Sequence, residues 1–582
     1  MIDIHQVLET RYPALFRQHR RIGTVLARFL GYLFYQTRFR QFGQDYPHLQ
    51  GFDFVEEALR YFDFTLRIRD NERCRIPASG RVVIAANHPI GSLDGLALLN
   101  LVHKVRPDVK VVANDLLTAV SPLQAVLLPV TNMGGSTPRQ NLRRIHDHLE
   151  QEGALIIFPA GEVSRFGVKG VKDGAWQSGF VRIAAATRAP ILPVYVAGRN
   201  SLFFYSISFL AKPLSTLWLV REMFRQSHNT VDARVGQPVP WEHYSAMQLP
   251  PAQLAQLFRK HVYRIARDRR PIFQSIETVA APENRLLLRQ EINASESLGA
   301  TPDGKRIQLC RMAEAPCVMR EIGRLRELAF RAVGEGSGLP RDIDRFDRDY
   351  LQLVLWDPQE LEIAGAYRLG DARALVARGG MTALYTHTLF AFGPGMAPYL
   401  QQGLELGRSF VQPRYQTRQS LDYLWLGIGA FLRRYPSYRY LFGPVSISRL
   451  YGEEAIGLLV DHYACHYAHM ALDLKPRTPF VPAAGQRTLH SEVSKDRDAE
   501  ADFRILQDTL AERGLRVPTL LKHYAQVAEP SGIAITAFNV DSNFGHCVDG
   551  FVLVDLERMK PRKRQRYLEN GNAGGSSSSD TD

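Results

Sequence analysis

Short apolar runs and helical stretches alternate over the first half of the chain. Three runs, residues 80–88, 153–159 and 190–196, are rich in Val, Ile, Leu and Ala and are bounded by polar or proline-marked turns. Runs of this length and composition predict buried β-strands. Residues 138–151 and 178–187, which lie between the runs, predict helices. Strands and helices in this order predict an α/β domain.

Two polar turns follow predicted strands. His88 ends the first run, and the turn Pro159–Glu162 follows the second. In α/β domains ligands bind at the carboxyl ends of the strands, which meet at one edge of the sheet. We therefore expect the two turns to lie at the same edge.

A second domain is predicted in the other half of the chain. After a linker that begins near Arg267, residues 289–299 form a helical pattern that ends at a glycine. Residues 349–356 and 361–369 then predict two adjacent strands of a hairpin.

The length of the chain agrees with this division, because 582 residues exceed what one hydrophobic core usually organises. We predict four parts, in chain order: a helical, membrane-interfacial segment over 1–69, a first domain over 70–270, a second domain over 276–560, and a tail over 561–582 that is first basic and then disordered.

The composition of the chain narrows the classes of molecule that it could bind. The net charge of +13 suits acidic partners, which include nucleic acid, anionic lipid headgroups and acidic carrier proteins. Nucleic acid is disfavoured because the sequence contains no motif that reads bases. The five cysteines are scattered without a C-x-x-C pair, so we expect a reducing compartment and no zinc site.

The chain is expected to lie on a membrane rather than to cross it. Its first residues lack the pattern of a secretory signal, and the uncharged stretches 116–138 and 201–219 are broken by proline and polar residues. Either stretch could instead dip into a headgroup layer. The helical stretch Arg20–Phe42 interleaves arginine with Leu, Phe and Tyr, which is typical of an interfacial helix and equally of the basic, solvated face of a core helix.

His88 and Asp94 are the first candidate catalytic residues. A carboxylate on one ring nitrogen of a histidine fixes its tautomer and stabilises the imidazolium that forms when the other nitrogen takes a proton. No G-x-S-x-G motif supplies a serine nucleophile, so the hydroxyl of the substrate would attack directly. A lone histidine is more often structural, and other motifs must support this interpretation.

Four sequence blocks in order resemble the glycerolipid acyltransferase family over roughly residues 70–245. They are His88 with Asp94, the Gly/Arg block 134–139, the turn 158–165 after a strand, and the apolar run 189–194. The family pattern is H-x4-D and P-E-G, whereas this chain has H-x5-D and Pro-Ala-Gly-Glu. Gly91 could absorb the extra residue, but the His–Asp geometry and the headgroup of the acceptor depart from the family pattern.

The resemblance implies a role for each matching residue. His88 would be the base and Asp94 its partner, whereas Arg139, Gly161 and Glu162 would bind the acceptor. Backbone N–H groups near the turn Pro159–Glu162 would stabilise the developing negative charge of the thioester carbonyl.

In the second domain, Glu405 and Arg408 form a pair that is usually structural. The residues around it nevertheless resemble two groups with the N-acetyltransferase-like α+β fold: the N-acyltransferases of lyso-ornithine lipid and the acylhomoserine lactone synthases. The resemblance covers roughly 276–558 and rests on Arg326 to Phe330, 365–369, Glu405-x-x-Arg408 and 539–551. It implies that an amine attacks an acyl thioester and that Glu405, Arg408 and Arg368 line the site; it names no base.

Two further patterns are weaker. Arg331–Gly336 matches the R-x-x-G-x-G loop that binds coenzyme A, but it follows a helix rather than a strand, so we expect no phosphate site. His462, His466 and His469 have helical spacing but lack a further suitable ligand, so we expect aromatic packing and no metal.

Together the two halves resemble the fused synthases of ornithine lipid. The resemblance implies that the second domain joins a 3-hydroxyacyl chain from acyl carrier protein, or from coenzyme A, to the α-amine of ornithine. The first domain would then esterify the 3-hydroxyl of this lyso-lipid. We expect no bound cofactor, and a cytoplasmic location on the inner face of the cell membrane. Glycine, lysine or glutamine could replace ornithine.

Two other functions stay open. One is a single-activity acyltransferase for lysophosphatidate or another lysophospholipid, in which the second half docks a carrier protein. The other is a noncatalytic membrane scaffold.

Overall fold

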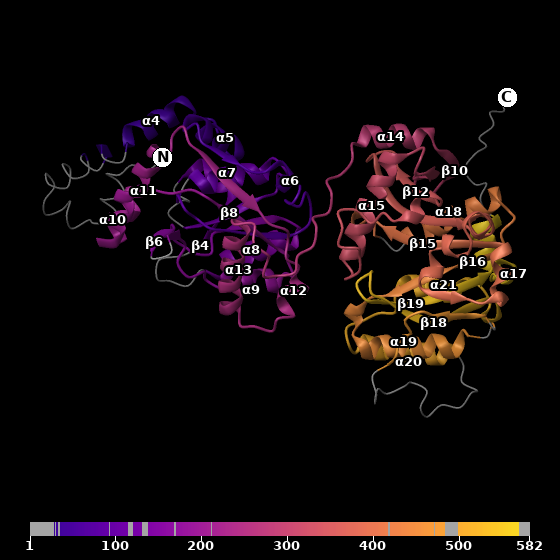
Figure 1. Ribbon diagram of the computed structural model, residues 1–582. Coiled ribbons are helices and arrows are strands. Elements are labelled where there is room, and N and C mark those ends of the chain that lie inside the picture. Colours follow the sequence, from indigo (N-terminus) through magenta and orange to yellow (C-terminus); the bar gives the residue numbers. More distant parts are fainter. Residues whose placement is uncertain are drawn as a thin grey trace, which may run out of the picture. The chain divides into compact units, whose positions relative to one another are not determined.

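The computed structural model describes residues 28, 31–32, 35–91, 93–114, 120–130, 138–167, 170–210, 212–416, 419–468, 470, 472–482 and 499–569 (Figure 1). Its contacts divide the chain into two compact units, Met1–Ala281 and Pro282–Asp582. The division lies beyond the predicted linker because the linker packs on the first unit. Phe273 stacks on Phe258 at 4.1 Å between ring centroids, and the hydroxyl of Thr278 donates to the carbonyl of Arg75 at 2.7 Å.

The N-terminal unit is a sheet covered by helices. Its helices are α4 Gln36–Asp45, α5 Gly51–Tyr61, α6 Asp70–Arg73, α7 Leu93–His103, α8 Arg139–Glu150, α9 Gly179–Ala186, α10 Leu202–Leu210, α11 Lys212–Arg225, α12 Trp241–Ser245 and α13 Pro251–Ile265. Its strands are β1 Thr65–Arg67, β2 Val82–Ala86, β3 Lys110–Asn114, β4 Leu127–Val130, β5 Ala154–Ile157, β6 Arg165–Gly167, β7 Gly170–Lys172, β8 Ile191–Val196 and β9 Thr230–Val235.

The main sheet has the order β1-β9-β8-β2-β5-β3-β4. Strands β2, β3, β4, β5 and β8 are parallel, and β9 runs antiparallel to β8. The predicted α/β fold and the three predicted strands are confirmed. Because β2 and β5 are neighbours, the turns that follow them lie at the same edge of the sheet, as expected.

Successive side chains of β2 pack on opposite faces of the sheet, as expected for a strand in the middle of it. Its five residues are all buried, but Ile84 packs with α5 and α7, whereas Val83 and Ala85 pack with α8, α9 and α13. A strand that is covered on both faces is continuously apolar. This is why residues 82–86 lack polar positions and why polar residues, Asn87 and His88, come only after the strand ends.

Part of the predicted N-terminal segment belongs to the core. Val55 and Leu59 of α5 are buried, and β1 pairs with β9 in the main sheet. The predicted interfacial helix Arg20–Phe42 lies largely outside the described residues; α4 starts at Gln36. None of the helices described by the structure is both long and apolar enough to cross a bilayer.

The C-terminal unit also combines helices with a sheet. Its helices are α14 Arg285–Ala294, α15 Pro316–Arg331, α16 Ala372–Gly379, α17 Ala397–Gln401, α18 Ser420–Arg434, α19 Glu453–His466, α20 Ala499–Ala511, α21 Thr519–Val527 and α22 Pro561–Arg564. Its strands are β10 Glu296–Ala300, β11 Arg306–Arg311, β12 Leu351–Asp357, β13 Glu362–Asp371, β14 Phe390–Phe392, β15 Gly403–Val411, β16 Tyr440–Ile447, β17 Leu474–Pro476, β18 Ile533–Asp541 and β19 Cys547–Asp555.

The large sheet of this unit has the order β10-β11-β12-β13-β15-β16-β19-β18. The predicted hairpin of β12 and β13 is confirmed. Strands β15 and β16 are parallel, but their pairing ends at Glu405 and Phe442, although β15 continues to Val411 and β16 to Ile447. The two strands therefore part in the middle of the sheet, next to Arg408.

The final segment differs from the prediction. Residues 561–569 form α22 and a further helical turn instead of a tail, and Tyr567 is 1% exposed. Its hydroxyl donates to Asp422 at 2.7 Å, and its ring packs against Trp425 at 5.7 Å between centroids. The sequence analysis missed this helix because most of its residues are basic or polar and only Tyr567 and Leu568 pack against the core.

This packing predicts a loss of stability in Tyr567→Ala. Removing a buried aromatic ring costs about 3 kcal/mol, because the apolar contact is lost and a cavity remains. Denaturant unfolding of the full chain measures the change. The control, Arg562→Ala, removes an exposed residue of α22 and should leave the unfolding midpoint unchanged. Equal midpoints for both variants would contradict the packed helix.

Candidate functional site

His88 and Asp94 lie against each other at the carboxyl end of β2. Nδ1 of His88 is 3.1 Å from Oδ2 of Asp94, which lies in the first turn of α7. Asp94 is fully buried and accepts the backbone N–H groups of Ile90 and Gly91 at 2.9 and 3.0 Å. The carboxylate is thus held by the loop that connects it to the histidine.

Gly91 accommodates the extra residue between His88 and Asp94. It has a φ of 100°, which favours glycine, and an added Cβ would lie 2.6 Å from Cγ2 of Val163. Both the conformation and the space therefore require glycine. The longer spacing still brings the histidine and the carboxylate into contact.

The electrostatics of the pair suit a proton acceptor. Burial by itself lowers the pKa of His88, but the negative charge of Asp94 outweighs it, so the pKa lies above the ordinary histidine value. Burial raises the pKa of Asp94, but His88 and the backbone donors outweigh it, so the pKa of Asp94 lies below its usual value. Asp94 therefore stays ionised and stabilises an imidazolium at His88.

The turn Pro159–Glu162 lies beside the histidine. The rings of Phe158 and His88 stack at 4.2 Å between centroids, and the N–H of Ser164 donates to the carbonyl of His88 at 2.9 Å. Gly161 has a φ of 65°, and its N–H donates to the carbonyl of Phe158 at 3.1 Å. This N–H is therefore used within the turn, which argues against it as a donor to the thioester oxygen.

The other two predicted acceptor-binding residues are exposed. Glu162 forms an ion pair with Arg165 at 3.1 Å. Arg139 is the first residue of α8, which follows the edge strand β4. Because β5 and β3 separate β4 from β2, Arg139 lies at the same edge as His88 but farther along it. Residues 134–137 of its block lie outside the described residues.

Asp173 is a buried group that the sequence did not single out. Its Oδ1 accepts the N–H of His88 at 3.3 Å, and its Oδ2 accepts the indole N–H of Trp176 at 2.9 Å. Burial raises its pKa despite the hydrogen bonds from Ser164 and Trp176. Asp173 thus fixes the backbone of His88 from a position 85 residues along the chain, where no local pattern could reveal it.

In the C-terminal unit, Arg368 and Arg408 meet at Asp344. Nη1 of Arg368 lies 2.7 Å from Asp344, and Nη2 of Arg408 lies 3.7 Å from it. Arg408 also contacts Asp342 at 3.0 Å through Nε and donates to the hydroxyl of Tyr385 at 3.0 Å. Arg408 has a φ of 50°, which is unusual for arginine, and it lies in a bulge of β15 opposite β13.

Glu405 belongs to the same network but does not pair directly with Arg408. Its buried carboxylate accepts the hydroxyl of Tyr350 and, at 2.6 Å, the N–H of Thr386. The hydroxyl of Tyr350 also accepts the N–H of Tyr385 at 3.0 Å. Burial raises the pKa of Glu405 against these hydrogen bonds. Glu405 therefore positions the segment that carries Tyr385, which contacts Arg408.

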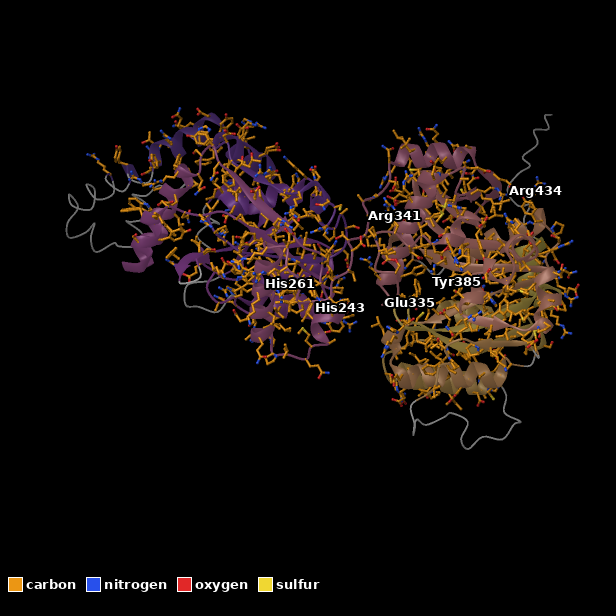
Figure 2. The ribbon with its side chains drawn as sticks, viewed as in Figure 1. His243, His261, Glu335, Arg341, Tyr385 and Arg434 are labelled. Atoms are coloured by element: carbon orange, nitrogen blue, oxygen red, sulfur yellow. The ribbon has the colours of Figure 1, made fainter. Side chains whose placement is uncertain are left out.

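Two carboxyl groups near Arg408 were not identified from the sequence as site residues. Asp549, on β19, is 5% exposed, and its one described hydrogen bond comes from the thiol of Cys547 at 3.7 Å. Burial and the neighbouring charges of Asp541 and Glu335 raise its pKa to about 8. Glu335, labelled with Tyr385 in Figure 2, accepts the hydroxyl of Ser446 at 3.0 Å, and burial raises its pKa to about 7.

Acidic groups outnumber basic ones in this network. It contains three arginines, Arg326, Arg368 and Arg408, and seven carboxyl groups, Glu335, Asp342, Asp344, Asp347, Glu405, Asp541 and Asp549. A buried excess of carboxyl groups is stable only if some are protonated or a cation binds. The network is thus suited to a cationic substrate.

The loop Arg331–Gly336 does not offer a phosphate site. It follows α15, as the sequence predicts, and the N–H groups next to it, on Ser337 and Gly338, donate to the carboxylate of Glu327 at 2.9 and 2.8 Å. An internal carboxylate therefore occupies the position that a phosphate would need.

The predicted histidine cluster is partly described. Nε2 of His466 lies 3.0 Å from Asp502, and the rings of His462 and His466 are 4.9 Å apart; His469 lies outside the described residues. Within the described part of the chain, no group of three His, Cys, Asp or Glu side chains could hold a metal ion.

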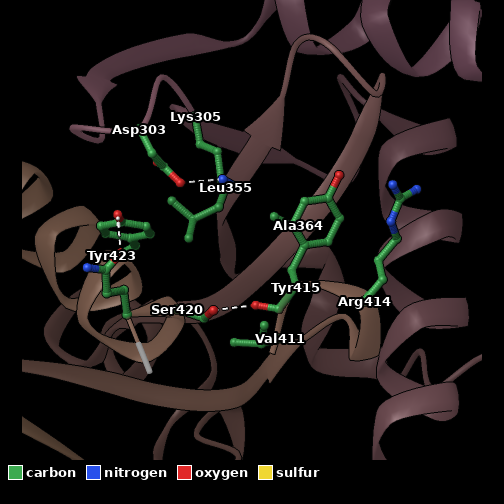
Figure 3. Close-up of a pocket in the computed structure, with 10 residues that line it drawn as sticks. Asp303, Lys305, Leu355, Ala364, Val411, Arg414, Tyr415, Ser420 and Tyr423 are labelled. Atoms are coloured by element: carbon green, nitrogen blue, oxygen red, sulfur yellow. Dashed lines mark hydrogen bonds and ion pairs between the residues drawn. The ribbon is translucent and has the colours of Figure 1, made fainter. Parts of the chain in front are cut away.

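A cavity of about 360 Å³ lies on the face of the large sheet opposite to Arg368 (Figure 3). Leu355 and Ala364 line it and belong to the core that packs against α18, whereas Arg368 alternates with residues of that core and so faces the opposite side. Its cations are paired: Lys305 contacts Asp303 and Arg414 contacts Glu362 at 2.5 and 2.8 Å. The cavity is separate from the network around Arg408.

Family comparisons match both units. The acyltransferase family model matches residues 7–268, and the acetyltransferase (GNAT) domain model matches residues 325–426. His88 and Asp94 lie inside the first of these regions, and Arg326, Arg368 and Arg408 lie inside the second.

Each of three curated relatives matches about half of the chain. A glycine N(alpha)-acyltransferase of Bacteroides thetaiotaomicron is 32% identical over 50% of this chain and 90% of its own length. A lyso-glycine lipid O-acyltransferase of Phocaeicola vulgatus is 29% identical over 46% of this chain and 95% of its own. An L-ornithine N(alpha)-acyltransferase of Brucella abortus is 26% identical over 42% of this chain and 84% of its own length. The chain therefore belongs to the acyltransferases, as an N-terminal acyltransferase domain joined to a C-terminal acetyltransferase (GNAT) domain of the amino acid N-acyltransferase family.

Proposed function

We propose that the chain makes a diacyl amino acid lipid in two consecutive steps. The C-terminal domain acylates the α-amine of ornithine with a 3-hydroxyacyl chain from acyl carrier protein, and the N-terminal domain then esterifies the 3-hydroxyl group. One observation carries this proposal. The two halves are similar to relatives that are separate proteins and are named for an amino acid N-acyltransferase and for a lyso-lipid O-acyltransferase.

In the esterification, the hydroxyl of the lyso-lipid attacks the thioester carbonyl. His88 takes the hydroxyl proton on Nε2 while Asp94 stabilises the imidazolium through Nδ1. The C–O bond forms as the C–S bond breaks, and the proton passes from His88 to the leaving thiolate. Asp173 holds the backbone of His88 in place during this transfer.

In the N-acylation, the α-ammonium of the amino acid must lose a proton before it attacks. Asp549 is the proposed proton acceptor, because the one hydrogen bond that the described residues give its carboxyl group comes from a thiol and because its pKa of about 8 is close to that of an α-amine. The C–N bond forms as the C–S bond breaks, the nitrogen passes its second proton to the leaving thiolate, and Asp549 releases the first proton to solvent.

The excess of carboxyl groups around Arg408 supports ornithine, which carries a second ammonium group. Glycine is the second candidate, because the glycine N(alpha)-acyltransferase relative is more similar than the ornithine one, 32% against 26% identical. Acyl carrier protein is the proposed donor, with coenzyme A as the alternative, and we place the chain on the cytoplasmic face of the membrane. The net charge of +13 supports binding to an acidic carrier and to anionic lipid.

Expression of variants in a host without aminolipids tests the two steps. The wild type should yield a phosphorus-free diacyl aminolipid, detected by mass spectrometry. His88→Asn should accumulate the monoacyl lipid, because the loss of a general base slows esterification roughly 100- to 10,000-fold.

The matched control is His228→Asn. His228 contacts Asp63 at 2.9 Å through the same ring nitrogen but is 80% exposed, so its replacement should leave the diacyl lipid unchanged. If both variants still make the diacyl lipid, His88 is not the base. If the wild type makes no aminolipid and esterifies lysophosphatidate instead, the two-step function is wrong.

The proton acceptor is tested through the pH dependence of N-acylation. Asp549→Asn keeps the shape of the side chain but cannot ionise, so at pH 7 it should lower kcat/KM roughly 100-fold. The difference in kcat/KM between the variant and the wild type should become smaller as the pH rises above about 8, because more of the amine is then already deprotonated. Asp541, Glu335, Arg408 and Cys547 surround the group and stay in place.

Glu335→Gln is the matched control for this measurement. Glu335 already accepts a hydrogen bond from Ser446, so it should contribute less than Asp549 to proton transfer. If Glu335→Gln shows the pH-dependent defect and Asp549→Asn does not, Glu335 is the proton acceptor and the assignment to Asp549 is wrong.

A further inference from the structure

We propose that β6, the start of α10 and the adjoining part of α11 form a bilayer-docking face that holds the protein on anionic lipid beside His88. This face is defined by Phe166, Leu202 and Phe203 together with Arg165, Arg199 and Arg221. The inference deepens the proposed function, because it states how a lipid acceptor reaches the histidine.

The docking face exposes large apolar side chains. Leu202, Phe203 and Phe166 are 80%, 51% and 55% exposed, whereas the next two residues of α10, Phe204 and Tyr205, are buried. The buried pair forms a small core with Val163, so the helix already has its own inward face. The outward apolar residues are therefore not needed for the packing of the unit, and such residues together mark an interaction surface.

These residues come from neighbouring elements. The rings of Phe203 and Trp218 are 4.9 Å apart, which joins α10 to α11, and the rings of Phe166 and Tyr205 are 6.4 Å apart, which joins β6 to α10. Figure 1 shows α10, α11 and β6 at one end of the N-terminal unit.

Charge identifies anionic lipid as the partner. The docking face carries Arg165, Arg199 and Arg221, and the segments Glu162–Gly167 and Arg199–Arg225 that form it contain two acidic residues, Glu162 and Glu222. Glu222 is buried, and Glu162 pairs with Arg165. Arg221 lies over the ring of Trp218 at 5.0 Å. Basic groups beside exposed aromatic and aliphatic residues are typical of a surface that binds anionic headgroups.

The docking face is continuous with the loop that carries the catalytic pair. An added Cβ on Gly91 would lie 2.6 Å from Val163 and 3.2 Å from Leu219 of α11. The side-chain amide of Asn200, just before α10, donates to the carbonyls of Pro89 and Ile90 at 3.2 Å each. A lyso-lipid could therefore keep its acyl chain in the bilayer while its hydroxyl reaches His88.

Vesicle flotation of the purified full chain tests this surface. The wild type should float with vesicles that contain phosphatidylglycerol and bind vesicles of pure phosphatidylcholine more weakly. The double variant Leu202→Glu with Phe203→Glu should lower vesicle binding at least tenfold, and so should Arg199→Glu with Arg221→Glu on the charged vesicles.

The matched control is Leu286→Glu with Leu287→Glu. These adjacent residues of α14 are 59% and 50% exposed in the C-terminal unit, and their replacement should leave flotation unchanged. The midpoint of denaturant unfolding of the full chain serves as the test of folding, and Phe166→Glu is a second variant outside α10 should the first one unfold.

Vesicle binding does not depend on which acceptor is acylated, so the docking face and the proposed function can fail separately. Unchanged flotation of the α10 and Phe166 variants overturns the proposal, as does equal binding to charged and uncharged vesicles. A change from dimer to monomer without a change in flotation would show that a second copy covers this face and would also overturn it.

Discussion

A carboxylate that is completely buried must be compensated, and this constraint organises the N-terminal site. Asp94 is surrounded by backbone N–H groups of its own loop and by the ring of His88. Leaving such a charge unpaired costs several kcal/mol. The loop, the glycine that shapes it and the histidine at the end of β2 are therefore held in one arrangement, and this arrangement orients a base toward the edge of the sheet.

The same constraint shapes the C-terminal site. There the charges to be compensated are arginines, and the carboxyl groups around them are in excess. Arg408 lies half-buried where β15 and β16 part, Arg368 is buried on the neighbouring β13, and each is compensated by aspartates from the segment before β12. The carboxyl groups beyond those needed for the arginines, Glu335 and Asp549, have raised pKa values because nothing compensates them fully. A network of this kind combines fixed charges with groups that can accept protons near neutral pH.

Some of this could be read from the sequence. The strands that precede His88 and Pro159 were predicted because a central strand is apolar at every position, and the role of Gly91 was predicted from the extra residue in the His–Asp spacing. Asp173 and Glu335 could not be found in this way, and Asp549 lay in the matching block 539–551 without an assigned role. Their importance depends on contacts between segments far apart in the chain, such as the pairing of β16 with β19, which no local pattern encodes. The helix around Tyr567 was missed because the segment is mostly basic and only Tyr567 and Leu568 pack against the core.

The central claim is that one chain carries out both acyl transfers in order. A time course with the purified full chain, anionic vesicles, labelled ornithine, 3-hydroxyacyl carrier protein and acyl carrier protein measures this directly. We predict that a monoacyl ornithine lipid appears first and is then converted to the diacyl lipid. Labelled ornithine that stays unacylated, while added lysophosphatidate is esterified by the same preparation, would contradict the account.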